Sequence, residues 1–382
     1  MDVLHPRCAG LDVHKRTVVA TVRRVEPVGE VEQKTKTFAT MTRDLLALAD
    51  WLAAQGVTIV ALESTGSYWK PVFNLLEGRF QVVLVNAHHI KQVPGCKTDV
   101  KDSQWIAQLL QHGLLRPSFI PPRPTRELRD LTRQRTRLIA EKSAVANRIQ
   151  KVLEDANIKL GSVASNVLGK SGRDMIEAII RGEYDPVKLA ELARRRLRGK
   201  IPQLQQALRG SVTEHHRFLL RAHMDHLAHL ERLIERFDHQ IDEALLPFAE
   251  VVRRVMTIPG VDQRVAEVVL AEIGLEMDRF PTAGHLASWA GLASGNHESA
   301  GKRQSGRTTP GNRWLKTALV QAAWAAARAR GTHLSEKFRR VAGRRGGKRA
   351  AVAVGHMILV IIYHLLKEGT SYQEIGGEAT AA

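Results

Sequence analysis

The chain has 382 residues, 44% of them hydrophobic, and is therefore long enough for two or three domains with substantial cores. Its formal net charge of +18 at pH 7 points to a polyanionic partner and favours nucleic acid over an anionic membrane surface. With only two cysteines, Cys8 and Cys96, a disulfide framework and a cysteine-based zinc site are excluded. The N-terminus lacks the uninterrupted apolar segment of a signal peptide, so we expect a protein of the reducing cytoplasm.

The N-terminal part of the chain alternates between predicted strands and helices. The apolar, β-branched run VTIVALE at 57–63 is typical of a buried parallel strand. Three strands followed by helix–strand repeats form an α/β order that matches the ribonuclease-H-like arrangement. The expected elements are strands at 8–13, 17–25, 31–38, 57–63 and 81–85, and helices near 42–55, 70–78 and 99–112.

The middle of the chain is predicted to be helical. The Pro-rich segment 116–126 cannot be a regular helix or a central strand, so a domain should end there. Two long helices are expected at 125–156 and 214–244, with shorter helices between them. The second carries apolar residues spaced alternately by three and four, a coiled-coil seam that could lie within one chain or between subunits. Its members are Leu220, His223, Leu227, Leu230, Ile234, Phe237 and Ile241.

The last part of the chain combines apolar helices with a strongly basic segment. Residues 301–350 contain 14 lysines and arginines but a single acid, Glu336. The apolar stretch 350–366 is short for a membrane span and is expected to be a buried helix beneath the basic segment. We therefore expect three domains: an α/β domain at 1–120, a helical coiled-coil linker or oligomerisation region at 121–249, and a helical domain at 250–382.

Four acids stand where strands end or a helix begins. Asp12 and Glu63 each end a predicted strand, and Asp99 and Asp102 lie three residues apart at a predicted helix start. Ligands gather at the carboxyl ends of parallel strands, and converging carboxylates need a cation such as Mg²⁺ or Mn²⁺. A pair of such ions can clamp a phosphodiester during strand cleavage. Taken singly, each acid could instead be a turn former or a helix cap.

Two lysines flank these acids. Lys15 follows the first strand, and Lys97 precedes Asp99. They are candidates for contact with the phosphate backbone, and the alternative is that they are solvated surface lysines.

The segments GLDVHK, LESTG and KTDVKDS resemble the motifs of the DEDD transposases of insertion-sequence family 110, particularly its subgroup 1111. The resemblance implies a first domain similar to RuvC-type resolvases and assigns the metal-binding role to Asp12, Glu63, Asp99 and Asp102. Ser103 stands where alanine is commoner in this family.

The C-terminal segments IPGVDQRVAEVVLAEIG, LASWAGL and ESAGKRQSGRTTPGNRWLKTAL are similar to the second signature of the same family. The resemblance implies a serine nucleophile at Ser299, with Ser305 as the rival position. The alternative is that both serines only form hydrogen bonds with backbone groups of a Gly-rich loop. Four basic residues here are expected to contact nucleic acid or to neutralise the negative charge that develops during cleavage: Lys302, Arg303, Arg307 and Arg313.

Two further features of this region have alternative interpretations. The Pro259–Gly260 turn resembles a helix-hairpin-helix, whose backbone amides can receive a DNA phosphate at Gly260, although a simple helix corner would use the same glycine. Trp289 and Trp314 lie on apolar helix faces and are expected in the core rather than against bases.

The resemblance implies a recombinase guided by a structured non-coding bridge RNA that pairs with both donor and target DNA. It also implies a dimer or tetramer in which the acids of one subunit meet the serine of another, and a phosphoserine intermediate. From the short apolar stretch at 350–366, no membrane partner is expected. One alternative is a metal-dependent junction resolvase or nuclease without a covalent intermediate. The other is a non-catalytic nucleic-acid-binding protein.

Overall fold

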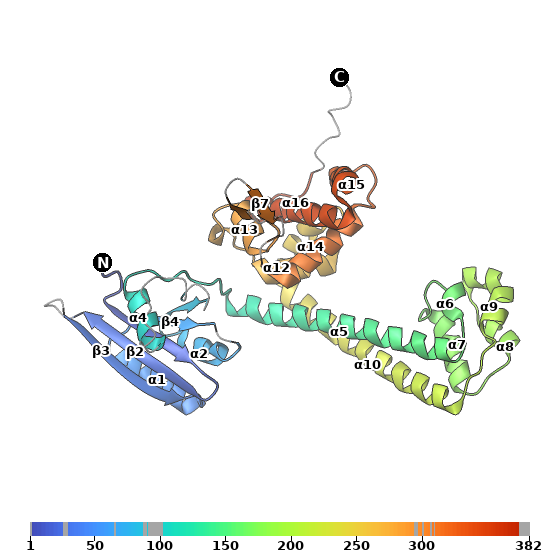
Figure 1. Ribbon diagram of the computed structural model, residues 1–382, viewed down its shortest axis with the longest axis horizontal. Helices are drawn as coiled ribbons and strands as arrows, with labels where there is room; N and C mark the ends of the chain where they lie inside the picture. The colour runs from blue at the N-terminus through green and yellow to red at the C-terminus, as the bar shows by residue number, and fades with distance from the viewer. Residues whose placement is uncertain are drawn as a thin grey trace, which may run out of the picture. The chain divides into compact units, whose positions relative to one another are not determined.

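The computed structural model describes residues 2–25, 30–64, 66–86, 90, 102–293, 297–299, 302–305, 308 and 310–373 (Figure 1). The chain divides into two compact units, Met1–Pro121 and Pro122–Ala382.

The N-terminal unit is built on a five-stranded sheet in the order β3-β2-β1-β4-β5. The first three strands pair antiparallel, and β4 and β5 continue the sheet in parallel with β1. The predicted α/β organisation of this unit is confirmed. The strands are β1 Arg7–Val13, β2 Thr17–Val25, β3 Val31–Ala39, β4 Ile59–Glu63 and β5 Gln81–Val85, and the helices are α1 Thr42–Ala54, α2 Trp69–Leu76 and α4 Asp102–Gln111.

Helices cover both faces of this sheet. Because successive side chains of a strand point to opposite faces, each strand contributes to two cores. Leu11 and Leu62 belong to the core shared with α1 and α2. Cys8 and Ala61 belong to the core shared with α4. The alternation therefore puts positions 12 and 63 on the face that α4 covers.

The second unit begins with a long helical hairpin of α5 (Arg123–Asp155) and α10 (Glu214–Leu245), which lie side by side (Figure 1). The apolar seam of α10 is buried within the single chain, so this pairing is intramolecular. Met224 replaces His223 as the buried residue at its position, and Phe237 is half-buried. Short helices close the far end of the hairpin: α6 Leu160–Val163, α7 Lys170–Ile180, α8 Pro186–Glu191, η1 Arg195–Lys200 and α9 Ile201–Ala207.

The C-terminal part packs helices around α16 (Gly347–Glu368). This helix is long and apolar enough to cross a membrane, but half of its apolar stretch is buried inside the molecule. Val354, Ile358 and Ile362 are fully buried in the core, as expected for a core helix. The helical C-terminal organisation is therefore confirmed. The other helices are η2 Leu246–Phe248, α11 Ala249–Met256, α12 Gln263–Ile273, η3 Met277–Arg279, α13 Ala283–Trp289, α14 Arg313–Ala326 and α15 His333–Arg345.

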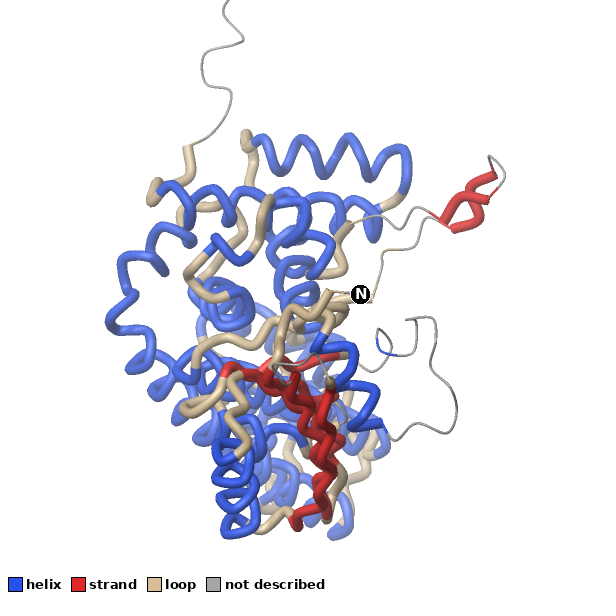
Figure 2. The backbone as a smooth tube through the Cα atoms, turned by 90° about the vertical axis from the view of Figure 1, so that its left-hand side faces the viewer, coloured by secondary structure: helices blue, strands red, loops and turns tan. Residues whose placement is uncertain are grey.

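The segment expected to be a Gly-rich loop contains a two-stranded antiparallel ribbon, β6 (His297–Ser299) and β7 (Lys302–Ser305). These two strands form a sheet of their own and are drawn in red in Figure 2.

Candidate functional site

Two of the predicted acids end neighbouring parallel strands. The register between β1 and β4 runs to the pair Leu11 and Leu62, and the next residue in each strand is Asp12 and Glu63. Both acids therefore stand at the same carboxyl edge of the sheet, on the face covered by α4, where ligands of parallel sheets gather.

The third acid reaches this edge because α4 packs directly on the backbone of β1. A Cβ atom on Gly10 would lie 2.3 Å from the backbone nitrogen of Ala107 and 2.4 Å from the carbonyl oxygen of Ser103. Only a glycine permits this approach. Asp102 is the first residue of α4 and stands next to Ser103, so the contact at Gly10 sets its position over the strand that ends near Asp12.

The three acids share one electrostatic environment. Burial raises the pKa of Asp12, and the negative charges of Asp102 and Glu63 raise it further. His14, whose Nε2 lies 3.0 Å from Asp12 Oδ2, acts in the opposite direction. A cation beside Asp12 would offset both the burial and the repulsion, and carboxylate oxygens are the ligands that Mg²⁺ prefers.

The carboxylates do not form a closed ligand set in the described part of the chain. Among those residues, no three ligating side chains lie close enough together to hold a metal ion. The fourth predicted acid, Asp99, and the flanking Lys97 lie outside the described residues. Lys15 is exposed in the turn between β1 and β2, where its carbonyl oxygen accepts a hydrogen bond from Thr40.

The two candidate serines stand at opposite ends of the β6–β7 ribbon. Ser299 ends β6 and pairs with Lys302, the first residue of β7, whereas Ser305 pairs with His297. Arg303 lies inside β7, and Arg307 lies outside the described residues.

The segment that carries the ribbon is tied together at its base. A Cβ atom on Gly311 would lie 2.3 Å from the backbone nitrogen of Gly291, so the two ends of the segment meet. Asn312 then caps α14 by accepting hydrogen bonds from two backbone amides of its first turn. The same side chain donates to Glu272 Oε2 at 2.6 Å.

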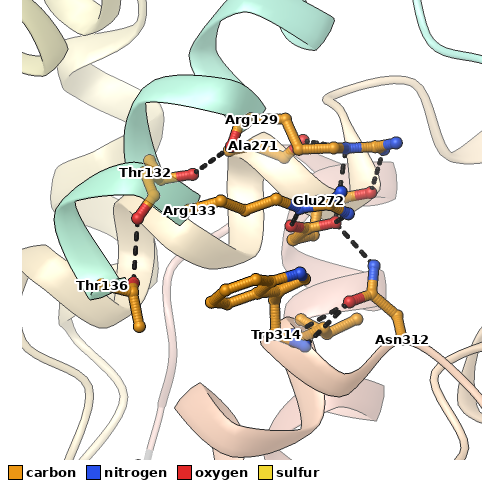
Figure 3. A network of polar contacts seen from close by, with 9 residues as sticks. Arg129, Thr132, Arg133, Thr136, Ala271, Glu272, Asn312 and Trp314 are labelled. Carbon is orange, nitrogen blue, oxygen red and sulfur yellow. Dashed lines mark hydrogen bonds and ion pairs between the residues drawn. The ribbon is translucent and has the colours of Figure 1, made fainter. Parts of the chain in front are cut away.

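Glu272 is a residue that sequence reasoning missed. It is fully buried in α12, and it accepts two hydrogen bonds from the guanidinium of Arg133 in α5, at 2.7 and 2.8 Å (Figure 3). Arg129 lies 3.3 Å from the same carboxylate. The ribbon segment is thereby anchored to the long helix α5. An acid inside the apolar run AEVVLAEIG is the signal in the sequence, since a buried carboxylate requires a partner.

The turn at Gly260 packs against α14. A Cβ atom there would lie 2.4 Å from the carbonyl oxygen of Ala322, and the φ angle of Gly260 is +86°. Close packing and backbone conformation account for the glycine, and contact with a phosphate stays a prediction.

Two segments of the chain match models of known transposase families. Residues 9–158 match a family model of DEDD-type IS110 transposases, described as a transposase. Residues 252–339 match a second model, described as the transposase IS116/IS110/IS902 family. The two matched segments together span more than half of the chain. The chain belongs to the IS110 family of transposases. As a member of this family, it is a recombinase that acts on DNA.

Relatives of this IS110-family transposase agree with the assignment. It is 28% identical over 304 residues to the insertion element IS110 uncharacterized 43.6 kDa protein of Streptomyces coelicolor, covering 73% of each chain. It is 24% identical over 335 residues to the transposase for insertion sequence element IS1111A of Coxiella burnetii, covering 84% of this chain and 81% of that protein. The pilin gene-inverting protein of Moraxella bovis is 27% identical over 156 residues, 39% of this chain and 48% of its own.

Proposed function

We propose that this transposase cuts and rejoins DNA through a covalent phosphoserine intermediate and is guided by a bridge RNA that pairs with donor and target DNA. The observation that carries the proposal is the placement of Asp12, Glu63 and Asp102 at one edge of the sheet, in a chain that also contains the Ser299 segment. The proposed activity would use three domains: a RuvC-like catalytic domain at 1–120, a helical arm at 121–249 and a transposase domain at 250–382. This activity belongs in the cytoplasm, on the cell's DNA.

The acids would hold the metal. Asp12, Glu63, Asp102 and, by its position in the motif, Asp99 would bind Mg²⁺ or Mn²⁺, which neutralises charge on the phosphodiester. Burial raises the pKa of Asp12, and the negative charges of Asp102 and Glu63 raise it further, so a cation at this edge would offset both effects.

Ser299 would supply the nucleophile. Its oxygen forms a new bond to phosphorus as the bond to one strand oxygen breaks, and the serine proton passes to that leaving oxygen. Attack by the hydroxyl of another strand reverses the step, so the number of phosphodiesters is conserved and no ATP is consumed. Lys302, Arg303 and Arg307 would neutralise the charge that develops on the phosphate, and Lys15 and Lys97 would hold the backbone near the acids.

The decisive experiment is denaturing electrophoresis of labelled DNA after reaction with wild type, Ser299→Ala and Ser305→Ala. Wild type and Ser305→Ala are expected to form a protein–DNA adduct, and Ser299→Ala none, while still binding DNA. An adduct that maps to Ser305 would show that Ser305, and not Ser299, is the nucleophile. Cleavage without any adduct would favour the alternative function, a metal-dependent junction resolvase.

The composite site between subunits is tested by mixing two inactive variants. If the acids of one subunit act on DNA held by the serine of another, Asp12→Asn and Ser299→Ala should restore recombination when combined. Failure to complement, with both variants folded and in one oligomer, would contradict a shared site.

The RNA partner is tested by sequencing the RNA that copurifies with the protein expressed with its native flanking DNA. A single enriched, structured transcript from those flanks is expected. If recombination proceeds unchanged after ribonuclease treatment of the protein, RNA is not required for the reaction.

A further inference from the structure

Three guanidinium groups surround the indole ring of Trp314. The carbon at the centre of each guanidinium lies within 6 Å of the ring centroid, at 4.7 Å for Arg313, 5.5 Å for Arg137 and 5.8 Å for Arg133. Arg133 and Arg137 come from α5, and Arg313 precedes Trp314 in α14. Figure 3 shows the ring of Trp314 lying beside Arg133.

Among the residues that the structure describes, only one of these three cations pairs with an acid. Arg133 forms the bidentate pair with Glu272 described above. Arg137 and Arg313 are both exposed, and neither has an acidic partner within the described residues. Arg137 and Arg313 therefore place two accessible charges on one ring, with no acid paired to either in the described part of the chain.

This arrangement disagrees with the expectation that Trp314 is a core residue. The ring is half-buried and lies outside the apolar core that contains Trp289 as a peripheral member. An indole that stacks on guanidinium groups fixes their planes without neutralising them. Two like charges held beside one ring attract an anionic ligand.

We infer that Arg137, Arg313 and Trp314 form a binding site for the phosphodiester backbone of a nucleic acid. Guanidinium groups match phosphate oxygens with paired N–H donors, which an ammonium group does not. A nucleic acid is favoured over an acidic protein because residues 301–350, which include Arg313, hold 14 basic residues and one acid. The site deepens the proposed function, on which it rests for the identity of the nucleic acid.

Arg137 is the new member of the nucleic-acid surface. It lies in the long arm helix, not in the basic C-terminal segment. Because Arg133 on the same helix is tied to Glu272, and Glu272 to Asn312, the phosphate site is rigidly connected to the base of the serine-bearing segment. A backbone held here is held at a fixed position relative to that base.

The test is equilibrium binding as a function of salt, with a 30-base-pair random DNA duplex and a random-sequence RNA hairpin as separate probes. All measurements contain EDTA, so the result does not depend on metal or on serine chemistry. Failure here would leave the adduct experiment unaffected, and the reverse also holds.

Arg137→Ala and Arg313→Ala are each expected to weaken binding about fivefold to tenfold near 0.1 M salt and to reduce the slope of log affinity against log salt by about one. The double variant should reduce the slope by about two. Arg137→Lys should keep the slope, because it keeps the charge. Whether affinity falls for the DNA probe, the RNA probe or both identifies which nucleic acid supplies the phosphate.

Arg148→Ala is the matched control. Arg148 is an exposed arginine on the same face of α5, about three turns or 16 Å farther along the helix. Its removal should leave the slope unchanged. Slopes of Arg137→Ala and Arg313→Ala equal to wild type, or equal to that of Arg148→Ala, would overturn the site. If an alanine variant lowers the melting temperature, Arg137→Lys decides instead: a folded lysine variant whose slope falls by as much as that of Arg137→Ala would also overturn the site.

Discussion

The hydroxyl oxygen of Ser103 lies 2.9 Å from that of Thr21, and both side chains are buried between α4 and the sheet. Thr21 pairs with Gly10 across β1 and β2, and it also lies 2.9 Å from the hydroxyl of Thr35 in β3. The hydroxyl contact and the glycine contact thus lie side by side and fix the first turn of α4. Asp102, which begins that turn, is held by both.

Gly10→Ala should destabilise the N-terminal unit and abolish recombination. The added methyl would meet backbone atoms of α4 rather than a side chain that can move, so the helix must shift. We expect a loss of about 1–3 kcal/mol in the free energy of unfolding, measured by urea denaturation. Gly78→Ala is the control, because no atom lies within 4 Å of its added methyl. Equal effects of the two changes would contradict the packing argument.

Neutral variants of the acids should separate activity from stability. Asp12→Asn, Glu63→Gln, Asp99→Asn and Asp102→Asn are each expected to abolish recombination with little change in melting temperature. Burial and neighbouring negative charge disfavour the ionised form of Asp12, so neutralising it removes a destabilising charge. Recombination assays in EDTA should likewise show no product. Full activity in EDTA would exclude the metal.

Glu272→Gln should lower the unfolding free energy of the protein by about 3–5 kcal/mol. It leaves the guanidinium of Arg133 without its buried counter-charge while keeping the size of the side chain. The measurement is a denaturation curve followed by circular dichroism. Glu250→Gln removes an exposed ion pair with Arg253, and we expect a change below about 1 kcal/mol there. A Glu272→Gln protein as stable as this control would show that the buried network contributes nothing.

Leu230→Asp combined with Ile234→Asp should unfold the helical arm in the individual chain. Both side chains are buried between α10 and the rest of the arm, and each loss of such a side chain costs about 2–5 kcal/mol even without adding a charge. Phe218→Asp on the same helix is the control, since Phe218 is 70% exposed. Circular dichroism and light scattering would distinguish unfolding from simple loss of assembly. A folded double variant of reduced mass would place the seam between subunits.

Much of the fold could be predicted because it follows from local periodicity. The short apolar run of β1 and the longer apolar run of β4 indicate their strands, and the acids at their ends indicate the edge where a site would form. The seam of α10 was predicted with one shift, from His223 to Met224, because a small helical rotation exchanges neighbouring positions.

Other features depend on partners far away in the chain. Glu272 is held by an arginine 139 residues earlier, and no local pattern reveals that pair. The sequence predicts a core position for Trp314 because tryptophan on an apolar helix usually packs there, whereas its neighbours in space include Arg133 and Arg137 of another helix. The β6–β7 ribbon was missed because its Gly-rich, polar sequence carries no alternation.

The helical hairpin begins and ends at the same hydrophobic core. Leu128 near the start of α5 and Leu245 at the end of α10 belong to the same C-terminal core. Val145 and Leu220 belong to the separate core at the distal end of the arm. Adding or deleting seven residues in both helices together would change the separation of the two cores by about 10 Å and leave each core intact. The arm is therefore a spacer whose reach can change during evolution independently of the chemistry at its base.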